Sequence, residues 1–215
     1  MVKCIIIWYN YKTVKNERRC VMKGGFFPLI SRMKYIGRWS LMRNTKEENL
    51  MEHSFETAVI AQALAIIGKK VYNKSVSPDR IASAALYHDT SEIITGDMPT
   101  PIKYGNDALK TAYKQVELGA KQRLCDLVPD IFRDEYEELI SFEEKYPEEY
   151  RYIKAADKIS AYLKCLDEEQ GGNHDFVSAK AQLLESIKAM NMEEADYFME
   201  NYIQLYGKTL DELTV

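Results

Sequence analysis

The chain has 215 residues, a length that suits one domain and argues against two full ones. Hydrophobic residues make up 46% of it and charged residues 29%, enough for both a sizeable core and a polar surface. The net charge of −4 offers no positive field to a nucleic-acid polymer or an anionic membrane. A substrate the size of a nucleotide must therefore be held by local cations.

Cysteine usage and the N-terminal sequence bear on the compartment. No CxxC pair is present, and the run 4–9 is far too short to span a bilayer and lacks the layout of a signal peptide. We therefore expect a cytoplasmic protein without a membrane partner, whose thiols are reduced. The cysteines are Cys4, Cys20, Cys125 and Cys165.

Residues 1–21 differ from the rest because they show no clear helical period. They precede Met22-Lys23-Gly24-Gly25, which resembles the natural start of a protein. The codons AGG AGG would encode Arg18-Arg19 and would also form a ribosome-binding sequence upstream of Met22. The two interpretations are a short N-terminal arm and a start placed too early, so that the domain covers 22–215.

Helical periodicity dominates the remaining chain, and strand-like alternation is nearly absent outside 4–9. The first long helix is expected over 45–67, capped by Asn44 or Thr45 and stopped by Gly68. Proline and capping residues mark most of the other boundaries. The remaining expected helices are 78–94, 106–127, 130–142, 147–170, 175–190 and 193–206, with a proline-containing loop at 97–101. The sequence predicts an all-α, single-domain helical bundle.

Four side chains on three expected helices form a candidate metal site. His88 and Asp89 are adjacent, His53 lies 35 residues upstream, and Asp157 lies 68 residues downstream among small apolar neighbours. Facing helices of a bundle commonly build metal sites, and two imidazoles with two carboxylates suit a first-row divalent cation such as Mn, Co, Fe or Zn. Glu92, four residues after His88, is expected on the same helical face.

Several segments carry a resemblance to one family. Residues 88–101, HDTSEIITGDMPTP, resemble the HDxSExxTGDxPTP segment of the bacterial 5'-deoxynucleotidases, the YfbR-like branch of the HD-domain phosphohydrolases. Residues 31–44 resemble the N-terminal segment of that family, and 52–54 the segment of its first metal histidine. Residues 154–166 and 196–199 resemble its distal aspartate helix and a C-terminal segment. The resemblance spans about 22–213.

The resemblance implies an HD-domain bundle that forms a homodimer and hydrolyses 2'-deoxyribonucleoside 5'-monophosphates with a divalent cation. Glu92 is then expected to work on the nucleophilic water, and Arg38 to orient the phosphate. Trp39 would line the substrate pocket. The implied metal ligands are His53, His88, Asp89 and Asp157, and the implied substrate contacts are Arg38, Trp39, Asp89, Asp97, Thr100 and Asp157.

The chemistry of the residues agrees with that activity. A divalent cation neutralises phosphate oxygens and makes a water molecule nucleophilic. Arg38 offers a planar fork of donors that matches a phosphate, which lysine does not. His174 falls outside the pattern and is expected to be structural. Two alternatives stay open: an HD phosphohydrolase for another nucleotide, such as a triphosphate or alarmone, and a non-catalytic nucleotide-binding HD protein.

Overall fold

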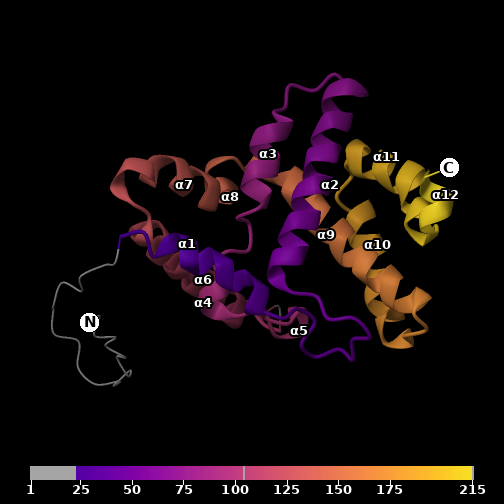
Figure 1. Ribbon diagram of the computed structural model, residues 1–215, viewed down its shortest axis with the longest axis horizontal. Coiled ribbons are helices and arrows are strands. Elements are labelled where there is room, and N and C mark those ends of the chain that lie inside the picture. The colour runs from indigo at the N-terminus through magenta and orange to yellow at the C-terminus, as the bar shows by residue number, and fades with distance from the viewer. Residues whose placement is uncertain (1–22, 104, 215) are drawn as a thin grey trace.

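The computed structural model describes residues 23–103 and 105–214 (Figure 1). The expectations for residues 1–21 and for the run 4–9 lie outside the described residues. Within them every regular element is a helix, and the one β-type contact is an isolated bridge between Gly37 and Asn49. The predicted all-α class is therefore confirmed.

Most of the helices follow one another with short connections, and the longest connection is the loop between η1 and α2. The long ones are α2 (Leu50–Lys70), α6 (Asp107–Leu127), α9 (Pro147–Gln170) and α10 (Val177–Lys188). The shorter α-helices are α1 (Phe26–Ile30), α3 (Pro78–Ala85), α4 (Glu92–Thr95), α5 (Thr100–Lys103), α7 (Arg133–Ile140), α8 (Phe142–Lys145), α11 (Glu193–Tyr202) and α12 (Leu210–Thr214). Four 3-10 turns complete the described fold: η1 (Ser31–Tyr35), η2 (Asp130–Phe132), η3 (His174–Phe176) and η4 (Ile203–Gly207).

Helix α2 is the centre of the larger hydrophobic cluster. It packs against α3, α9 and α11, and Figure 1 shows α2 and α9 crossing in the middle of the molecule. By length and composition α2 is apolar enough to cross a bilayer, but 56% of its most apolar window is buried inside the fold. That burial is typical of the core helix of a globular domain.

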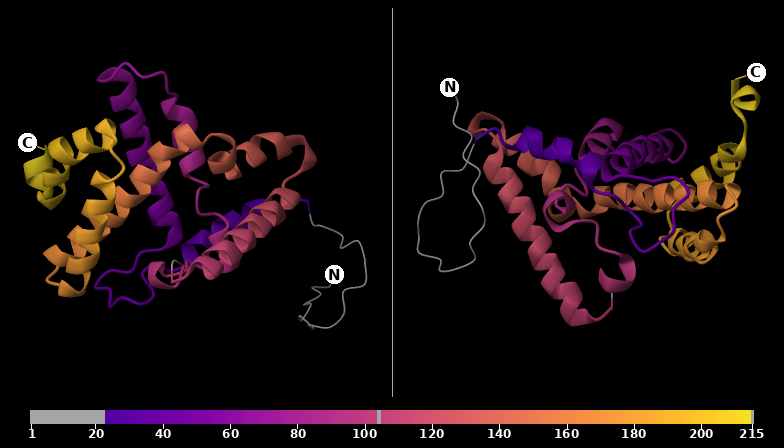
Figure 2. Two further views of the ribbon diagram at one scale, coloured as in Figure 1. Left: turned by 180° about the vertical axis from the view of Figure 1, so that it is seen from behind. Right: turned by 60° about the horizontal axis from the view of Figure 1, so that its bottom comes forward.

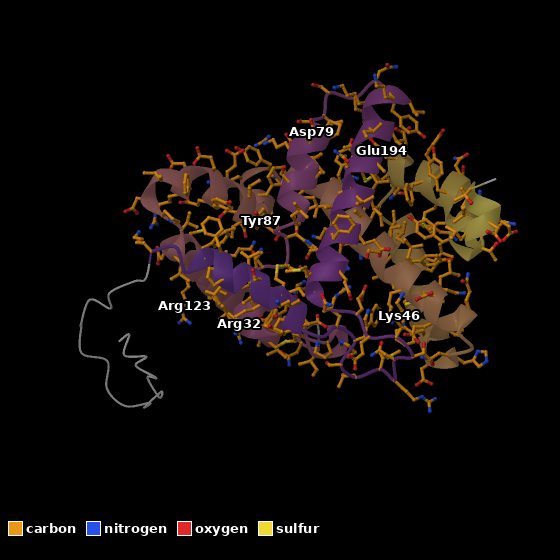
Figure 3. All side chains as sticks on the ribbon, in the orientation of Figure 1. Arg32, Lys46, Asp79, Tyr87, Arg123 and Glu194 are labelled. Carbon is orange, nitrogen blue, oxygen red and sulfur yellow. The ribbon has the colours of Figure 1, made fainter. Side chains whose placement is uncertain are left out.

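A second, smaller cluster holds the N-terminal helices to α6. Phe26 of α1 is fully buried and packs with Leu124, Val128 and Ile140. Tyr87, labelled in Figure 3, stacks on Phe26 at a ring-centroid distance of 6.3 Å. In the right-hand view of Figure 2, α6 slants away from α9, so this cluster forms a separate lobe. Tyr87 joins the segment that follows α3 to this lobe.

The helix expected over 78–94 is wrong as one continuous element. Helix α3 ends at Ala85, and α4 begins only at Glu92. Between them the backbone bonds mostly over three residues, as in Tyr87 N–H to Ala84 O and Glu92 N–H to Asp89 O. Side chains compete for the carbonyls here, because His88 Nδ1 lies 2.7 Å from Ala85 O and the Thr90 hydroxyl donates to Tyr87 O. His88 and Asp89 therefore lie in a tight turn.

Gly68 does not stop the first long helix, which continues to Lys70. A Cβ at Gly68 would lie 2.8 Å from Glu194 Oε1 and 2.9 Å from the Tyr152 hydroxyl oxygen. This glycine therefore allows α9 and α11 to approach α2 closely.

Two further boundaries also differ from expectation. The cap of α2 is Asn49, which forms a capping box with Glu52, and not Asn44 or Thr45. The loop expected over 97–101 contains the start of α5, because Pro101 stands in the first helical turn, where its missing N–H costs nothing.

Candidate metal centre and active site

Three segments of the larger cluster bring the four candidate ligands together. His53 of α2 is fully buried, and its Nε2 lies 3.1 Å from Asp157 Oδ1 on α9 and 3.7 Å from Asp89 Oδ2. His88 Nε2 lies 3.0 Å from the same Asp89 oxygen. One ligand atom from each residue falls within 4.8 Å of the others. The spacing expected from the sequence is therefore realised in space, and the assignment of these residues to a metal stays a proposal.

In both imidazoles the nitrogen that faces away from the cluster, Nδ1, makes a polar contact. His53 Nδ1 lies 3.1 Å from the Ser160 hydroxyl oxygen, and that hydroxyl donates to Glu56 Oε2 at 2.6 Å. His88 Nδ1 lies 2.7 Å from Ala85 O. A carbonyl oxygen can only accept a hydrogen bond, so Nδ1 must carry the hydrogen. These contacts fit the Nδ1–H tautomer and turn both Nε2 lone pairs toward the cluster.

The residues fit a divalent cation. His88 Nε2 is buried and lacks hydrogen-bond geometry to any described group, even to the nearby Asp89 oxygen. Ligands at roughly 2.0–2.2 Å from one ion lie at most about 4.4 Å apart, so the cluster needs only a small contraction to close around a cation. Burial opposes it, but the carboxylate of Asp89 raises the pKa of His88 to about 8. A cation would replace that proton.

Glu92 is the first residue of α4 and is 7% exposed. Its Oε2 is buried and has no hydrogen-bond partner among the described residues. Burial, together with the negative charges of Asp89 and Asp97, raises the pKa of Glu92 far above the ordinary range of a carboxyl group. This carboxyl is therefore poised to hold a proton beside the cluster.

Arg38 and Trp39 lie on the loop between η1 and α2. The Arg38 side chain is 12% exposed, and the negative charges around its guanidinium come from Glu48, Asp157, Asp89 and Asp97. Those charges offset the desolvation cost of burial and raise the pKa of Arg38 above its ordinary value. The guanidinium is thus held beside the four candidate ligands, where an anionic group of a substrate would meet it.

Trp39 connects the loop between η1 and α2 to two other segments. Its indole ring lies 5.3 Å from the ring of Phe176, and its backbone N–H is near enough to Asp97 to act on the pKa of that carboxyl group. Its backbone is left-handed, with φ 59°, a conformation that a bulky residue rarely adopts. Burial raises the pKa of Asp97, while Arg38 and the Trp39 N–H act to lower it. Asp97 is therefore part of the same constellation.

The remaining sequence candidates are Thr100 and His174. Thr100 begins α5, three residues after Asp97, and its contact with a substrate stays a prediction. His174 opens η3 and is exposed, outside the ligand cluster, as expected for a residue without a role in the site.

Comparison with known proteins identifies the family. The family model described as 5'-deoxynucleotidase YfbR-like matches residues 25–206. The chain belongs to this family. A 5'-deoxynucleotidase of Photobacterium profundum is 42% identical over 192 residues, which cover 89% of this chain and 99% of the relative. The 5'-deoxynucleotidase YfbR of Escherichia coli is 44% identical over 189 residues, or 88% of this chain and 95% of the relative. The resemblance found in the sequence is confirmed.

Two solved structures with a similar fold are described as HD phosphohydrolases. An HD-domain phosphohydrolase of Listeria innocua has a TM-score of 0.74 at 24% identity, over 85% of this chain and 88% of the other. The cyanophage S-2L HD phosphohydrolase, solved with dA and one catalytic Zn²⁺ ion, has a TM-score of 0.60 at 23% identity, over 85% and 96%. The HD-type bundle predicted for this YfbR-like chain is thus confirmed.

Two residues beside the site were missed in the sequence. Ser160 lies three residues after Asp157 on α9, so the helical period alone places it on the same face. Glu48 accepts hydrogen bonds from both Arg38 and Trp39, but it stands in an irregular loop, and no sequence period identifies it.

Proposed function

We propose that this YfbR-like chain hydrolyses 2'-deoxyribonucleoside 5'-monophosphates to a deoxyribonucleoside and inorganic phosphate. The observation that carries the proposal is the convergence of His53, His88, Asp89 and Asp157, with their ligand atoms within 4.8 Å, beside the buried guanidinium of Arg38. Relatives 42–44% identical over 88–89% of the chain bear the name 5'-deoxynucleotidase, which supports the same activity.

His53, His88, Asp89 and Asp157 would hold the cation. A nitrogen and oxygen donor set of this kind suits a first-row divalent metal, and we propose Co, Mn or a similar ion. When bound, the cation supplies positive charge against the phosphate and acidity to water. The zinc ion of the cyanophage HD phosphohydrolase supports a metal of this class.

Arg38 binds and orients the phosphate. Its guanidinium can donate two parallel hydrogen bonds to phosphate oxygens. This guanidinium is already buried and surrounded by carboxylates before the phosphate dianion binds. The charges of Asp89 and Asp157 act on the same guanidinium, and both residues would also contact the substrate. The phosphate group is thus held in one orientation for attack by water.

Glu92 moves the proton of the reaction. Its pKa is raised by burial and by the negative charge of Asp89, so its carboxylate is a stronger base than that of an exposed glutamate. As a carboxylate it aligns the attacking water and takes its proton. As an acid it returns that proton to the departing 5'-oxygen of the nucleoside.

Trp39 and the 97–100 segment line the sugar. The indole of Trp39 packs against Phe176, and the backbone N–H of Trp39 is near enough to Asp97 to act on its pKa, so Trp39 and Asp97 lie beside the same space. A wall packed against C2' rejects an added hydroxyl by steric clash and by leaving that hydroxyl unpaired. Little polar contact is then committed to the base, and base selectivity is expected to be weak.

We propose a homodimer, as the family resemblance implies, and a cytoplasmic location, as the spacing of the cysteines in the sequence favours. Light scattering after gel filtration measures the mass in solution. A monomer at working concentration contradicts the dimer and leaves the proposed reaction untouched.

The decisive experiment is phosphate release from a panel of nucleotides by metal-loaded protein, with and without EDTA. We expect hydrolysis of dAMP and 5'-dTMP with Co or Mn, weak hydrolysis of AMP and 3'-dTMP, and loss of all hydrolysis in EDTA. Equal rates for dAMP and AMP would replace the deoxy-specific enzyme by a general 5'-nucleotidase. Release only from dATP or an alarmone would favour another HD substrate, and no release at all would favour a non-catalytic nucleotide-binding protein.

A further inference from the structure

One carboxylate oxygen connects the two substrate residues of the loop. Glu48 Oε2 accepts a hydrogen bond from Arg38 NH1 at 3.0 Å and another from Trp39 Nε1 at 3.0 Å. The side chains of Arg38 and Glu48 are each 12% exposed. A charge-assisted hydrogen bond sheltered from water holds its geometry more firmly than a surface ion pair does.

The backbone fixes Glu48 in turn. Arg38 N–H donates to Glu48 O at 3.0 Å, and the bridge between Gly37 and Asn49 closes the loop at its base. Asn49 then caps α2, the helix that carries His53. Glu48 therefore lies between the metal-binding helix and the substrate loop, and its carboxylate has little freedom to follow a moving partner.

Arg38 has other acidic neighbours that compete for it. The carboxylates of Asp157, Asp89 and Asp97 all act on its guanidinium, and the first two are candidate metal ligands. Without Glu48 the guanidinium is free to leave the position in which that hydrogen bond holds it. The indole of Trp39 would at the same time lose the hydrogen bond that sets its rotation against Phe176.

We propose that Glu48 is a positioning residue that fixes the distance and angle between the phosphate-binding Arg38 and the sugar-facing Trp39, and thereby sets the discrimination between 2'-deoxyribose and ribose. The proposal rests on the proposed function. Because Glu48 Oε2 accepts from both donors, it fixes the positions of Arg38 and Trp39 relative to each other. The space left beside C2' of the substrate depends on both residues, so it changes when the Glu48 carboxylate is removed.

The test compares Glu48→Ala and Glu48→Gln with a control, Glu47→Ala. Glu47 is the neighbouring residue, and its side chain is exposed. Each protein is loaded with Mn, its metal content is measured, and kcat and KM are determined for dAMP and AMP. For Glu48→Ala we expect the ratio of kcat/KM for dAMP over AMP to fall about tenfold or more, the scale of one lost charge-assisted hydrogen bond. Metal content is expected to stay at the wild-type level, and Glu47→Ala to match wild type.

Glu48→Gln keeps the size of the side chain and one carbonyl acceptor but loses the charge. We expect a smaller fall in the same ratio, and this variant decides the matter if Glu48→Ala does not fold. A ratio that stays constant while both substrates slow down, or no change in either variant, overturns the proposal. Failure of the wild-type protein to hydrolyse dAMP contradicts the proposed function instead, so the two failures are distinct.

Discussion

The hydroxyl oxygen of Ser160 lies 3.1 Å from Nδ1 of His53. The same hydroxyl donates to Glu56 Oε2 at 2.6 Å, so a carboxylate, a hydroxyl and an imidazole form a chain that leads to the candidate ligand atom. The chain fixes the rotation and the tautomer of a fully buried ring. An outer contact of this kind tunes metal affinity without touching the metal.

Ser160→Ala is therefore expected to weaken metal binding by roughly 10- to 100-fold, because His53 Nδ1 loses its acceptor. The measurement is competition for the metal with a coloured chelator. The matched control is Ser54→Ala on α2, a buried serine whose hydroxyl has no partner among the described residues. Equal affinities for the two variants would show that Ser160 does not orient His53.

Asp89→Ala is expected to abolish activity and lower metal content together, because Asp89 lies close to both imidazoles and is the one candidate ligand next to His88 in sequence. Metal per chain is measured by elemental analysis alongside phosphate release from dAMP. Asp196→Ala, an exposed change at the start of α11, serves as control. Full metal content in Asp89→Ala would remove Asp89 from the ligand set.

Glu92→Gln is expected to keep the metal and slow kcat by about 100-fold or more, the usual scale for a positioned proton-transfer group. The amide has the size of the carboxyl but cannot exchange the proton that burial and Asp89 hold on Glu92. Single-turnover rates with dAMP, at measured metal content, give the answer. A near-normal rate would take Glu92 out of the proton transfer.

Glu168 is expected to make the stability of the fold dependent on acid. Burial acts to raise its pKa, but hydrogen bonds from Lys164, Thr45 and Asn173 hold that pKa below its ordinary value. A lowered pKa in the folded state stabilises the fold above the unfolded pKa of about 4.3, and this stabilisation is lost as pH falls below it.

Glu168→Gln is therefore expected to be less stable than wild type by about 3 kcal/mol at neutral pH, since it leaves the buried ammonium of Lys164 without its carboxylate. The gap is expected to narrow progressively as the pH falls below about 5, and to go on narrowing until the pH reaches the lowered pKa of Glu168 in the folded state. Urea unfolding followed by circular dichroism at several pH values measures both. A gap that is constant with pH would show that Glu168 is not the titrating group.

A chain that begins at Met22 is expected to fold and to hydrolyse dAMP like the full chain, because the family match begins at residue 25. Solubility, melting temperature and kcat of the two proteins decide the point. An inactive or insoluble shorter chain would assign residues 1–21 to the domain.

Local signals predicted the long helices well. Asn106 does cap α6, whose start and end agree with expectation, and Pro147 and Gly171 bound α9 as expected. These boundaries depend on residues within one turn of the helix end, which sequence reveals. The prediction that Gly68 ends the first long helix was wrong for the opposite reason. The role of Gly68 depends on Glu194 and Tyr152, which are distant in sequence.

The candidate site divides in the same way. The spacing of His53, His88, Asp89 and Asp157, read with the family resemblance, was enough to predict their convergence. The tight turn at His88 was missed, because it depends on side chains that bond to nearby carbonyls and not on hydrophobic period. Glu48 was missed because its partners become neighbours only when the irregular loop closes.

The candidate site lies where the two hydrophobic clusters meet. His53 and Asp157 belong to α2 and α9 of the larger cluster, whereas Tyr87 packs into the smaller one, and Glu92 opens α4, which rests on α6. The distance of Glu92 from His88 and Asp89 is set within one turn of the chain, whereas its distance from His53 and Asp157 depends on how the two clusters pack together. We therefore expect a buried change at the contact of α1 with α6 to slow turnover more than it lowers metal content.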